Sequence, residues 1–154
     1  MIKKVIGTII FFLFVSSANA VEPTVSSDWL KKNLNSPNVF VLDIRNKLDG
    51  GGYDAFKAEH IPGSVHSDYL AAGWRTTIKG VVGQFPGTKS LSQLIGGLEG
   101  VEKYKGYISY CNTGHWAATV WFGLSEIAQI PNVKMYDGGM THWTYDPKRK
   151  VDLS

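Results

Sequence analysis

The sequence contains a single cysteine, Cys111, among its 154 residues. One cysteine cannot form a disulfide within the chain, so the thiol contributes no internal cross-link. Such a thiol is either buried and inert, paired with another molecule, or reactive. Its position favours reactivity, because a short apolar run at 107–110 precedes it and a polar loop and a long apolar segment follow it. We therefore predict that Cys111 lies on the turn between a strand and a helix.

A large excess of charge of either sign is also absent. The formal net charge is +3, and it falls to +1 if the segment that carries Lys3 and Lys4 is removed. A nearly neutral chain has no electrostatic surface for nucleic acid or for an anionic membrane. We expect neither as a partner.

Long hydrophobic runs are limited to the first part of the chain. A basic start at Lys3 and Lys4 precedes an uncharged stretch at 5–15, and Ala18-Asn19-Ala20 matches the small-x-small pattern of a cleavage site. The stretch is shorter than the roughly 20 apolar residues of a membrane-spanning helix. We expect residues 1–20 to be a cleaved secretory signal peptide and 21–154 to be a soluble domain. The location would be periplasmic or secreted, with no membrane contact after cleavage.

The rest of the chain shows no internal repeat and no linker, so we expect one domain. Apolar spacing predicts strands that alternate with helices, which is typical of a mostly parallel sheet with helices on both faces. Glycine-rich residues 73–87 indicate an irregular surface loop. The predicted strands are 39–42, 64–66, 107–110 and 133–136. The first two predicted helices are a capped helix after Ser26 and a short helix at 53–58. A third begins near Ser90 and ends at Gly100, and a fourth, apolar nearly all round and therefore buried, follows Cys111.

Ligands of open parallel sheets bind beyond the carboxyl ends of the strands. Asp43, Arg45, Cys111 and Asp137 all fall at such ends. At a strand-to-helix turn, backbone N–H groups and the helix dipole stabilise an anion and lower the pKa of a thiol. We therefore expect the pKa of Cys111 to lie below the usual value of about 8.5.

Four short motifs follow one another along the sequence: Leu42-Asp43-Ile44-Arg45, Glu59-His60-Ile61-Pro62-Gly63-Ser64, Cys111-Asn112-Thr113-Gly114-His115-Trp116, and Tyr136-Asp137-Gly138-Gly139 followed by Trp143. In their order and spacing these motifs resemble the rhodanese family of sulfurtransferases. The resemblance implies an α/β fold with an open parallel sheet of about five strands and helices on both faces.

The resemblance also implies a function, that of a thiosulfate sulfurtransferase. Cys111 would take a sulfane sulfur from a small donor such as thiosulfate, hold it as a persulfide, and pass it to a thiol or cyanide-like acceptor. The N–H groups of the loop would stabilise the sulfur anions without a cofactor, and Gly114 would give the loop its backbone freedom. The substrate-binding residues would be Asn112, Thr113, Gly114, His115, Trp116 and Arg45.

Other functions fit the sequence less well. Phosphatases of this family carry an arginine six residues beyond the cysteine, where this chain has Ala117. A redox-sensing thiol would need a second, resolving cysteine. The alternative that we keep open is a non-catalytic rhodanese-like module that binds a partner protein or an anion.

Several side chains have a structural as well as a functional interpretation. Arg45 could bind the donor or form an ion pair with a nearby carboxylate, and Asp43 is expected to accept N–H bonds of its loop. His115, Arg45 or Arg75 could supply positive charge to the site. Trp116 and Trp143 could line a pocket or belong to the core. Cys111 and His115 lack a third metal ligand, so we predict no metal site.

Overall fold

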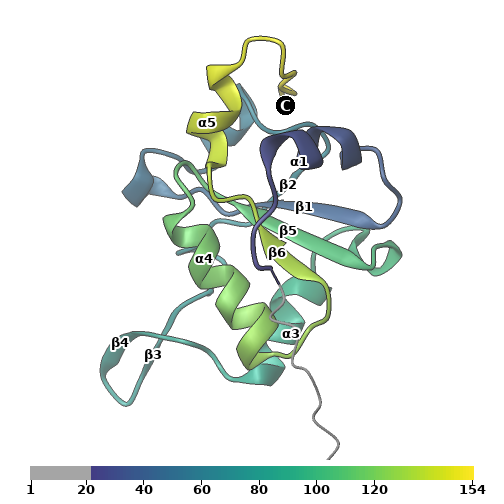
Figure 1. Ribbon diagram of the computed structural model, residues 1–154. Helices are drawn as coiled ribbons and strands as arrows, with labels where there is room; N and C mark the ends of the chain where they lie inside the picture. The colour runs from purple at the N-terminus through teal and green to yellow at the C-terminus, as the bar shows by residue number, and fades with distance from the viewer. Residues whose placement is uncertain (1–21) are drawn as a thin grey trace, which may run out of the picture.

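A computed structural model describes residues 22–154, and the predicted signal peptide at 1–20 therefore lies outside the described residues. Figure 1 shows a central sheet between two layers of helices, the α/β arrangement that the alternating pattern predicts. In the part of the chain that the structure describes, no helix is long and apolar enough to span a membrane.

The main sheet has four parallel strands in the order β2-β1-β5-β6, rather than about five. A short segment near the start of the described chain adds one parallel bridge at the β6 edge, between Thr24 and Met135. The order places β5, the strand that leads to Cys111, in the interior of the sheet. The strands are β1 (Val39–Asp43), β2 (Val65–His66), β5 (Gly106–Tyr110) and β6 (Val133–Met135).

Each face of the sheet packs against its own helices. Alternate side chains of β1 point to opposite faces, as the period of a strand requires: Phe40 and Leu42 join one cluster and Val41 the other. On the first face lie α3 (Thr88–Gly96), α4 (His115–Phe122) and the π-helical turn η3 (Gly123–Ile127). On the second lie α1 (Ser27–Asn33) and α5 (Gly139–Tyr145). Burial on both faces explains the continuous apolar run of β1.

The connections complete the fold. The segment after β1 contains the 3₁₀ turn η1 (Lys47–Asp49) and α2 (Tyr53–Ala58), and η2 (Val101–Lys103) precedes β5. Ser26 caps α1 as predicted, since its side chain accepts the N–H of Trp29 at 3.2 Å. The helix near Ser90 instead begins at Thr88 and is capped by Gly97, three residues before Gly100.

The apolar helix after Cys111 is less buried than its composition suggests. Ala117 and Val120 are buried in α4, but Phe122 is 43% exposed at its end. Phe122 packs beside Phe85, with ring centroids 5.5 Å apart. The exposed ring therefore contacts a segment outside the main sheet.

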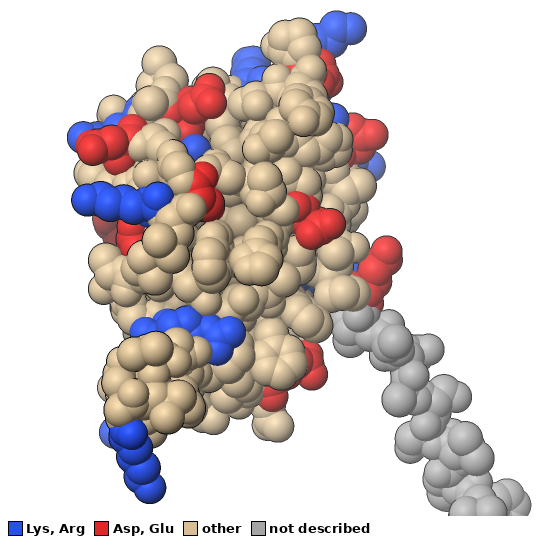
Figure 2. Space-filling view, turned by 90° about the vertical axis from the view of Figure 1, so that its left-hand side faces the viewer, with Lys and Arg blue, Asp and Glu red and all other residues tan. Residues whose placement is uncertain are grey.

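The segment 73–87 lies on the surface as predicted, but it is not irregular, because residues 76–84 form an exposed β-hairpin. Strands β3 (Thr76–Ile78) and β4 (Val81–Gln84) pair antiparallel around a turn in which Lys79 and Gly80 both have positive φ. That turn geometry matches the twist of a hairpin. The hairpin projects from the domain in Figure 1 and forms the lower-left lobe of Figure 2, which carries basic but no acidic side chains. No acidic residue occurs between Asp68 and Glu99.

Candidate active site

The carboxyl ends of β1, β5 and β6 bring the predicted side chains to one edge of the sheet. Asp43 ends β1 and pairs in register with Tyr110, the residue before Cys111. Asp137 follows β6, and its carbonyl oxygen lies against Gly114 of the cysteine loop. The topology therefore brings the four predicted residues together at the carboxyl ends of three neighbouring strands.

The sulfur of Cys111 faces a set of backbone donors. The backbone N–H groups of Ala117, Thr113 and Trp116 lie near the Cys111 sulfur and lower the pKa of the thiol, and we call these three groups the amide nest. Trp116 and Ala117 belong to the first turn of α4, where N–H groups have no partner within the helix. The resemblance implied that N–H groups of the loop stabilise the sulfur. Thr113 and Trp116 belong to that loop, and Ala117 follows it.

The start of α5 fixes the orientation of the loop. The carbonyl oxygens of Cys111 and Asn112 accept the N–H groups of Met140 (2.8 Å) and Thr141 (3.0 Å). In a trans peptide the C=O and N–H point in opposite directions. The bond from Thr141 to Asn112 therefore turns the N–H of Thr113 toward the sulfur.

Two glycines allow this close packing. Gly114 has φ +83°, and a Cβ there would lie 2.2 Å from the carbonyl oxygen of Asp137. Gly139 has φ +57°, and a Cβ there would lie 2.4 Å from the carbonyl oxygen of Cys111. Only glycine tolerates both the positive φ and the contact. The role of backbone freedom at Gly114 agrees with the prediction, whereas the role of Gly139 in the loop was missed.

The expected lowering of the thiol pKa is not found. Burial raises the pKa of Cys111, which is fully buried, and this effect exceeds the opposing effect of the amide nest. Nearby Asp49 raises the pKa further. Desolvation penalises the thiolate more than three neutral donors stabilise it. The nest is present, but the pKa of Cys111 is raised and not lowered.

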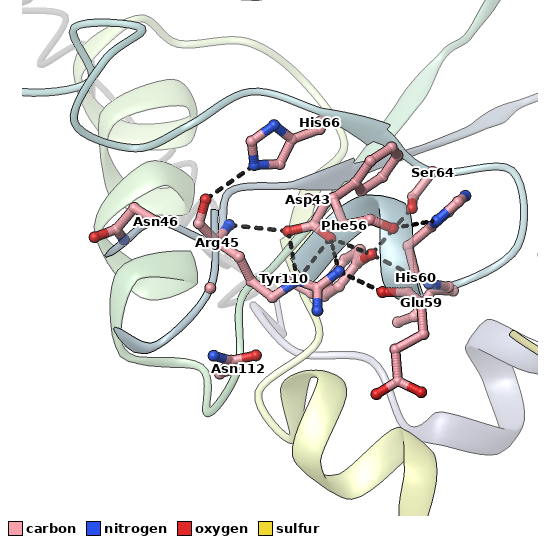
Figure 3. Close-up of polar contacts among 12 residues, drawn as sticks. Asp43, Arg45, Asn46, Phe56, Glu59, His60, Ser64, His66, Tyr110 and Asn112 are labelled. Carbon is pink, nitrogen blue, oxygen red and sulfur yellow. Dashed lines mark hydrogen bonds and ion pairs between the residues drawn. The ribbon is translucent and has the colours of Figure 1, made fainter. Parts of the chain in front are cut away.

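Beside the loop lies a buried polar network around Asp43 (Figure 3). The Arg45 guanidinium forms an ion pair with Asp43 (Nη2 to Oδ2, 2.8 Å) and donates to the carbonyl oxygen of Glu59 at 2.7 Å. Asp43 also accepts the N–H of Arg45 at 2.9 Å and the hydroxyl of Tyr110 at 2.7 Å. Burial lowers the pKa of Arg45, but the hydrogen bond and charge of Asp43 raise it above its ordinary value. Asp43 thus has the predicted structural role, and Arg45 forms the ion pair that we considered.

The remaining loop residues differ in exposure. Thr113 and His115 are exposed, Asn112 and Trp116 are partly buried, and Gly114 is buried. Asn112 donates its side-chain N–H to the carbonyl oxygen of Asp49 at 2.5 Å, which joins the loop to the segment after β1. The His115 ring lies edge-on to Trp116, with centroids 4.8 Å apart.

Arg75 and Trp143 lie away from the sulfur. Arg75 donates to the hydroxyl of Tyr69 at 3.0 Å and stacks over Phe85, 3.5 Å from its centroid. Tyr69 in turn packs against Trp116, with centroids 4.7 Å apart. Arg75 therefore reaches the loop only through Tyr69. Trp143 is fully buried in the cluster on the second face and belongs to the core.

Sequence reasoning missed Tyr110 and Asp49. Burial raises the pKa of Tyr110 well above its ordinary value, and the charge of Asp43 raises it further. The only sequence signal for Tyr110 was its position directly before Cys111. Among residues 22–154, no group of three or more His, Cys, Asp or Glu side chains could hold a metal ion.

Comparisons with known proteins agree with this geometry. A protein from Azotobacter vinelandii named thiosulfate sulfurtransferase is 26% identical over 136 residues, which are 86% of this chain and 46% of that protein. A sulfur carrier protein from Thermus thermophilus is 22% identical over 122 residues, 79% of this chain and 39% of that protein. This chain therefore spans less than half the length of these relatives.

Solved structures show the same fold. The anaerobic ergothioneine biosynthesis enzyme of Chlorobium limicola superposes with a TM-score of 0.65 at 20% identity, over 87% of this chain and 32% of that one. The family described as rhodanese-like domain matches residues 26–146, which include both the Asp43 network and the Cys111 loop. By this match, the chain is a member of the rhodanese-like domain family.

Proposed function

We propose that this protein is a sulfurtransferase that moves a sulfane sulfur from a donor such as thiosulfate to a thiophilic acceptor through a persulfide on Cys111. The observation that supports it most is the amide nest, because the three N–H groups of Thr113, Trp116 and Ala117 converge on the sulfur. Relatives named thiosulfate sulfurtransferase support the same reaction class.

The reaction has two displacements. The Cys111 sulfur loses its proton to solvent and attacks the outer sulfur of the donor; the S–S bond of the donor breaks, and with thiosulfate the electron pair leaves with sulfite. The acceptor nucleophile then attacks the outer sulfur of the persulfide. The bond between that sulfur and Sγ breaks, and Cys111 recovers the electron pair as a thiolate.

The loop residues have separate roles in this proposal. The N–H groups of Thr113, Trp116 and Ala117 stabilise negative charge on Sγ in both displacements, since preoriented donors in a buried site need little reorganisation. Gly114 shapes the loop. The side chains of Asn112, Thr113, His115 and Trp116 contact the substrates. Arg45, which lines the same cleft as Asn112, also contacts a substrate.

The intact-protein mass tests this function. After thiosulfate treatment we expect one added sulfur atom, its loss on reduction, and no addition to Cys111→Ser. A wild-type mass that stays unchanged with thiosulfate and with other sulfane donors would reject the reaction and favour a non-catalytic binding module. Turnover of an aryl phosphate that depends on Cys111 would instead support a phosphatase, despite Ala117.

We also propose that the protein acts in the periplasm or outside the cell as a single domain, residues 21–154. The basic start, uncharged run and Ala18-Asn19-Ala20 site support export. Mass analysis of the protein recovered from its native cells should give a chain that begins at Val21. A chain that keeps its first twenty residues would contradict this location.

A further inference from the structure

A cleft of about 480 Å³ opens between α2 and α5, beside the cysteine loop. Cys111 does not line it, but the next residue, Asn112, forms part of its wall. The other polar residues of the wall include Arg45, Glu59 and Thr141. The cleft is therefore a separate space next to the sulfur site, with charged groups of both signs.

Arg45 supplies fixed hydrogen-bond donors to this cleft. Its Nε donates to Asp43 and its Nη2 to Asp43 and to the carbonyl oxygen of Glu59, whereas Nη1 has no hydrogen-bond partner among residues 22–154. The side chain is only 3% exposed, so the guanidinium is held in place before any ligand arrives. A planar guanidinium with free N–H groups matches a carboxylate.

Acceptor atoms lie on either side of Arg45. Figure 3 shows the guanidinium between the side chains of Glu59 and Asn112. The Glu59 carboxylate is exposed and forms no ion pair within the described chain. Asn112 uses its amide N–H to bond Asp49, and its Oδ1 has no partner among the described residues. An ammonium group in the cleft beside Arg45 would meet the Glu59 carboxylate.

The balance of charge argues against a dianion in this cleft. Asp43 already neutralises Arg45, and Glu59 adds a negative charge, so the three side chains together are negative. A dianionic donor such as thiosulfate would be repelled by this sum. A ligand with one carboxylate and one ammonium group would meet a partner for each charge.

We propose that the cleft binds the sulfur acceptor, and that this acceptor is a small thiol with both a carboxylate and an ammonium group. This inference rests on the proposed sulfurtransferase function. The carboxylate binds Nη1 of Arg45, and the ammonium binds the Glu59 carboxylate. The acceptor thiolate reaches past Asn112, attacks the outer sulfur of the Cys111 persulfide, and releases the Cys111 thiolate as the product persulfide forms.

The test begins from the persulfide. The protein is loaded with thiosulfate, the added sulfur is confirmed by mass, and the donor is removed. Cysteine, cysteamine (no carboxylate) and 3-mercaptopropionate (no ammonium) are then compared at equal thiolate concentration. We expect cysteine to remove the sulfur about tenfold more efficiently than either analogue, since it alone gains both charged contacts. Equal rates for the three thiols would overturn the proposal.

Glu59→Gln isolates the ammonium contact, because the bond from Arg45 uses the backbone oxygen of Glu59 and survives. We expect this variant to load sulfur normally, to react about two- to fivefold more slowly with cysteine and cysteamine, and to keep its rate with 3-mercaptopropionate. Glu102→Gln is the matched control, since Glu102 is also exposed but lies in η2. Unchanged rates in Glu59→Gln would contradict the site.

A second probe needs no sulfur transfer. S-methylcysteine carries both charges but cannot accept sulfur, so it should compete with cysteine and leave the loading step unaffected. Absence of competition would reject the cleft as the acceptor site. Failure of the persulfide to form would instead reject the proposed function, so the two failures are distinguishable.

Discussion

The hydroxyl of Tyr110 donates a hydrogen bond of 2.7 Å to Oδ2 of Asp43, although 67 residues separate them. The same hydroxyl accepts the N–H of Ile61 at 3.2 Å and lies 3.0 Å from the Ser64 hydroxyl. The residue before Cys111 is thus tied both to β1 and to the turn before β2. This hydrogen bond fixes the end of β5, where the cysteine loop begins, relative to the end of β1.

Replacement of Tyr110 by Phe should destabilise the fold. The change leaves Asp43 without one donor and the N–H of Ile61 without its acceptor, both in a buried site, and we expect a loss of about 1–3 kcal/mol in the free energy of unfolding. Chemical denaturation measures it. Tyr136→Phe is the control, because its hydroxyl lies 2.9 Å from Nδ1 of His142 at a partly buried position. A loss in Tyr110→Phe no larger than in this control would contradict the argument.

Gly139→Ala should impair sulfur loading. The new Cβ would meet the carbonyl oxygens of Cys111 and Asn112 at 2.4 and 2.5 Å, so the loop must shift and the N–H of Thr113 must turn away from the sulfur. We expect loading by thiosulfate, followed by mass, to slow at least about tenfold, the effect of losing one preoriented anion donor.

The control for this change is Gly80→Ala in the hairpin. Gly80 has φ +82° and open space around its Cβ position, so it shares the backbone strain but not the contact with the loop. Both variants should lose about 1 kcal/mol of stability from the positive φ. Normal loading in Gly139→Ala would show that α5 does not orient the loop.

The raised pKa of Cys111 predicts a pH dependence. Alkylation by iodoacetamide should accelerate with pH and reach half its maximum above the value for an unperturbed thiol, because burial disfavours the thiolate. The folded thiol holds its proton more tightly than the unfolded one. The thiol therefore makes its full contribution to stability at pH values below its pKa in the unfolded chain. This contribution is lost as the pH rises through its pKa in the folded protein.

Denaturation of the wild type and of Cys111→Ser between about pH 7 and pH 10 measures this contribution. The free energy of unfolding of the wild type should fall relative to that of Cys111→Ser as the pH rises. An alkylation midpoint below that of a free thiol would reverse the sign of both expectations.

Arg75→Ala should affect the hairpin more than the donor site. Arg75 stacks over Phe85 and bonds the carbonyl oxygen of Gly83 at 3.1 Å, so its loss frees the base of the hairpin. We expect faster proteolysis within 76–84 and a KM for thiosulfate that changes less than about twofold. A large rise in KM would show that Arg75 supplies charge to the donor.

The strand ends and the cysteine loop could be predicted because their signals are local. The apolar run of β1, the cap at Ser26 and the position of Cys111 before an apolar segment each depend on a few neighbouring residues. The hairpin was missed because Lys79-Gly80 is a weaker turn signal than Asn-Gly, and its strands rely on Gly80 adopting positive φ.

The direction of the pKa shift could not be predicted from the loop sequence. It depends on how deeply the sulfur is buried, and Cys111 belongs to a buried cluster that includes residues from distant elements, such as Phe40 of β1 and Leu91 of α3. The contact between Gly139 and the loop likewise joins segments that are 28 residues apart in the chain. Long-range packing of this kind leaves no local pattern.

The contact of α5 with the cysteine loop has a consequence for how the protein matures. The residues that orient the loop carbonyls, Met140 and Thr141, are made about thirty positions after Cys111. A nascent chain therefore carries an ordinary, unshielded thiol until α5 docks. The proposed sulfur transfer would therefore begin only in molecules in which α5 has already docked on the loop.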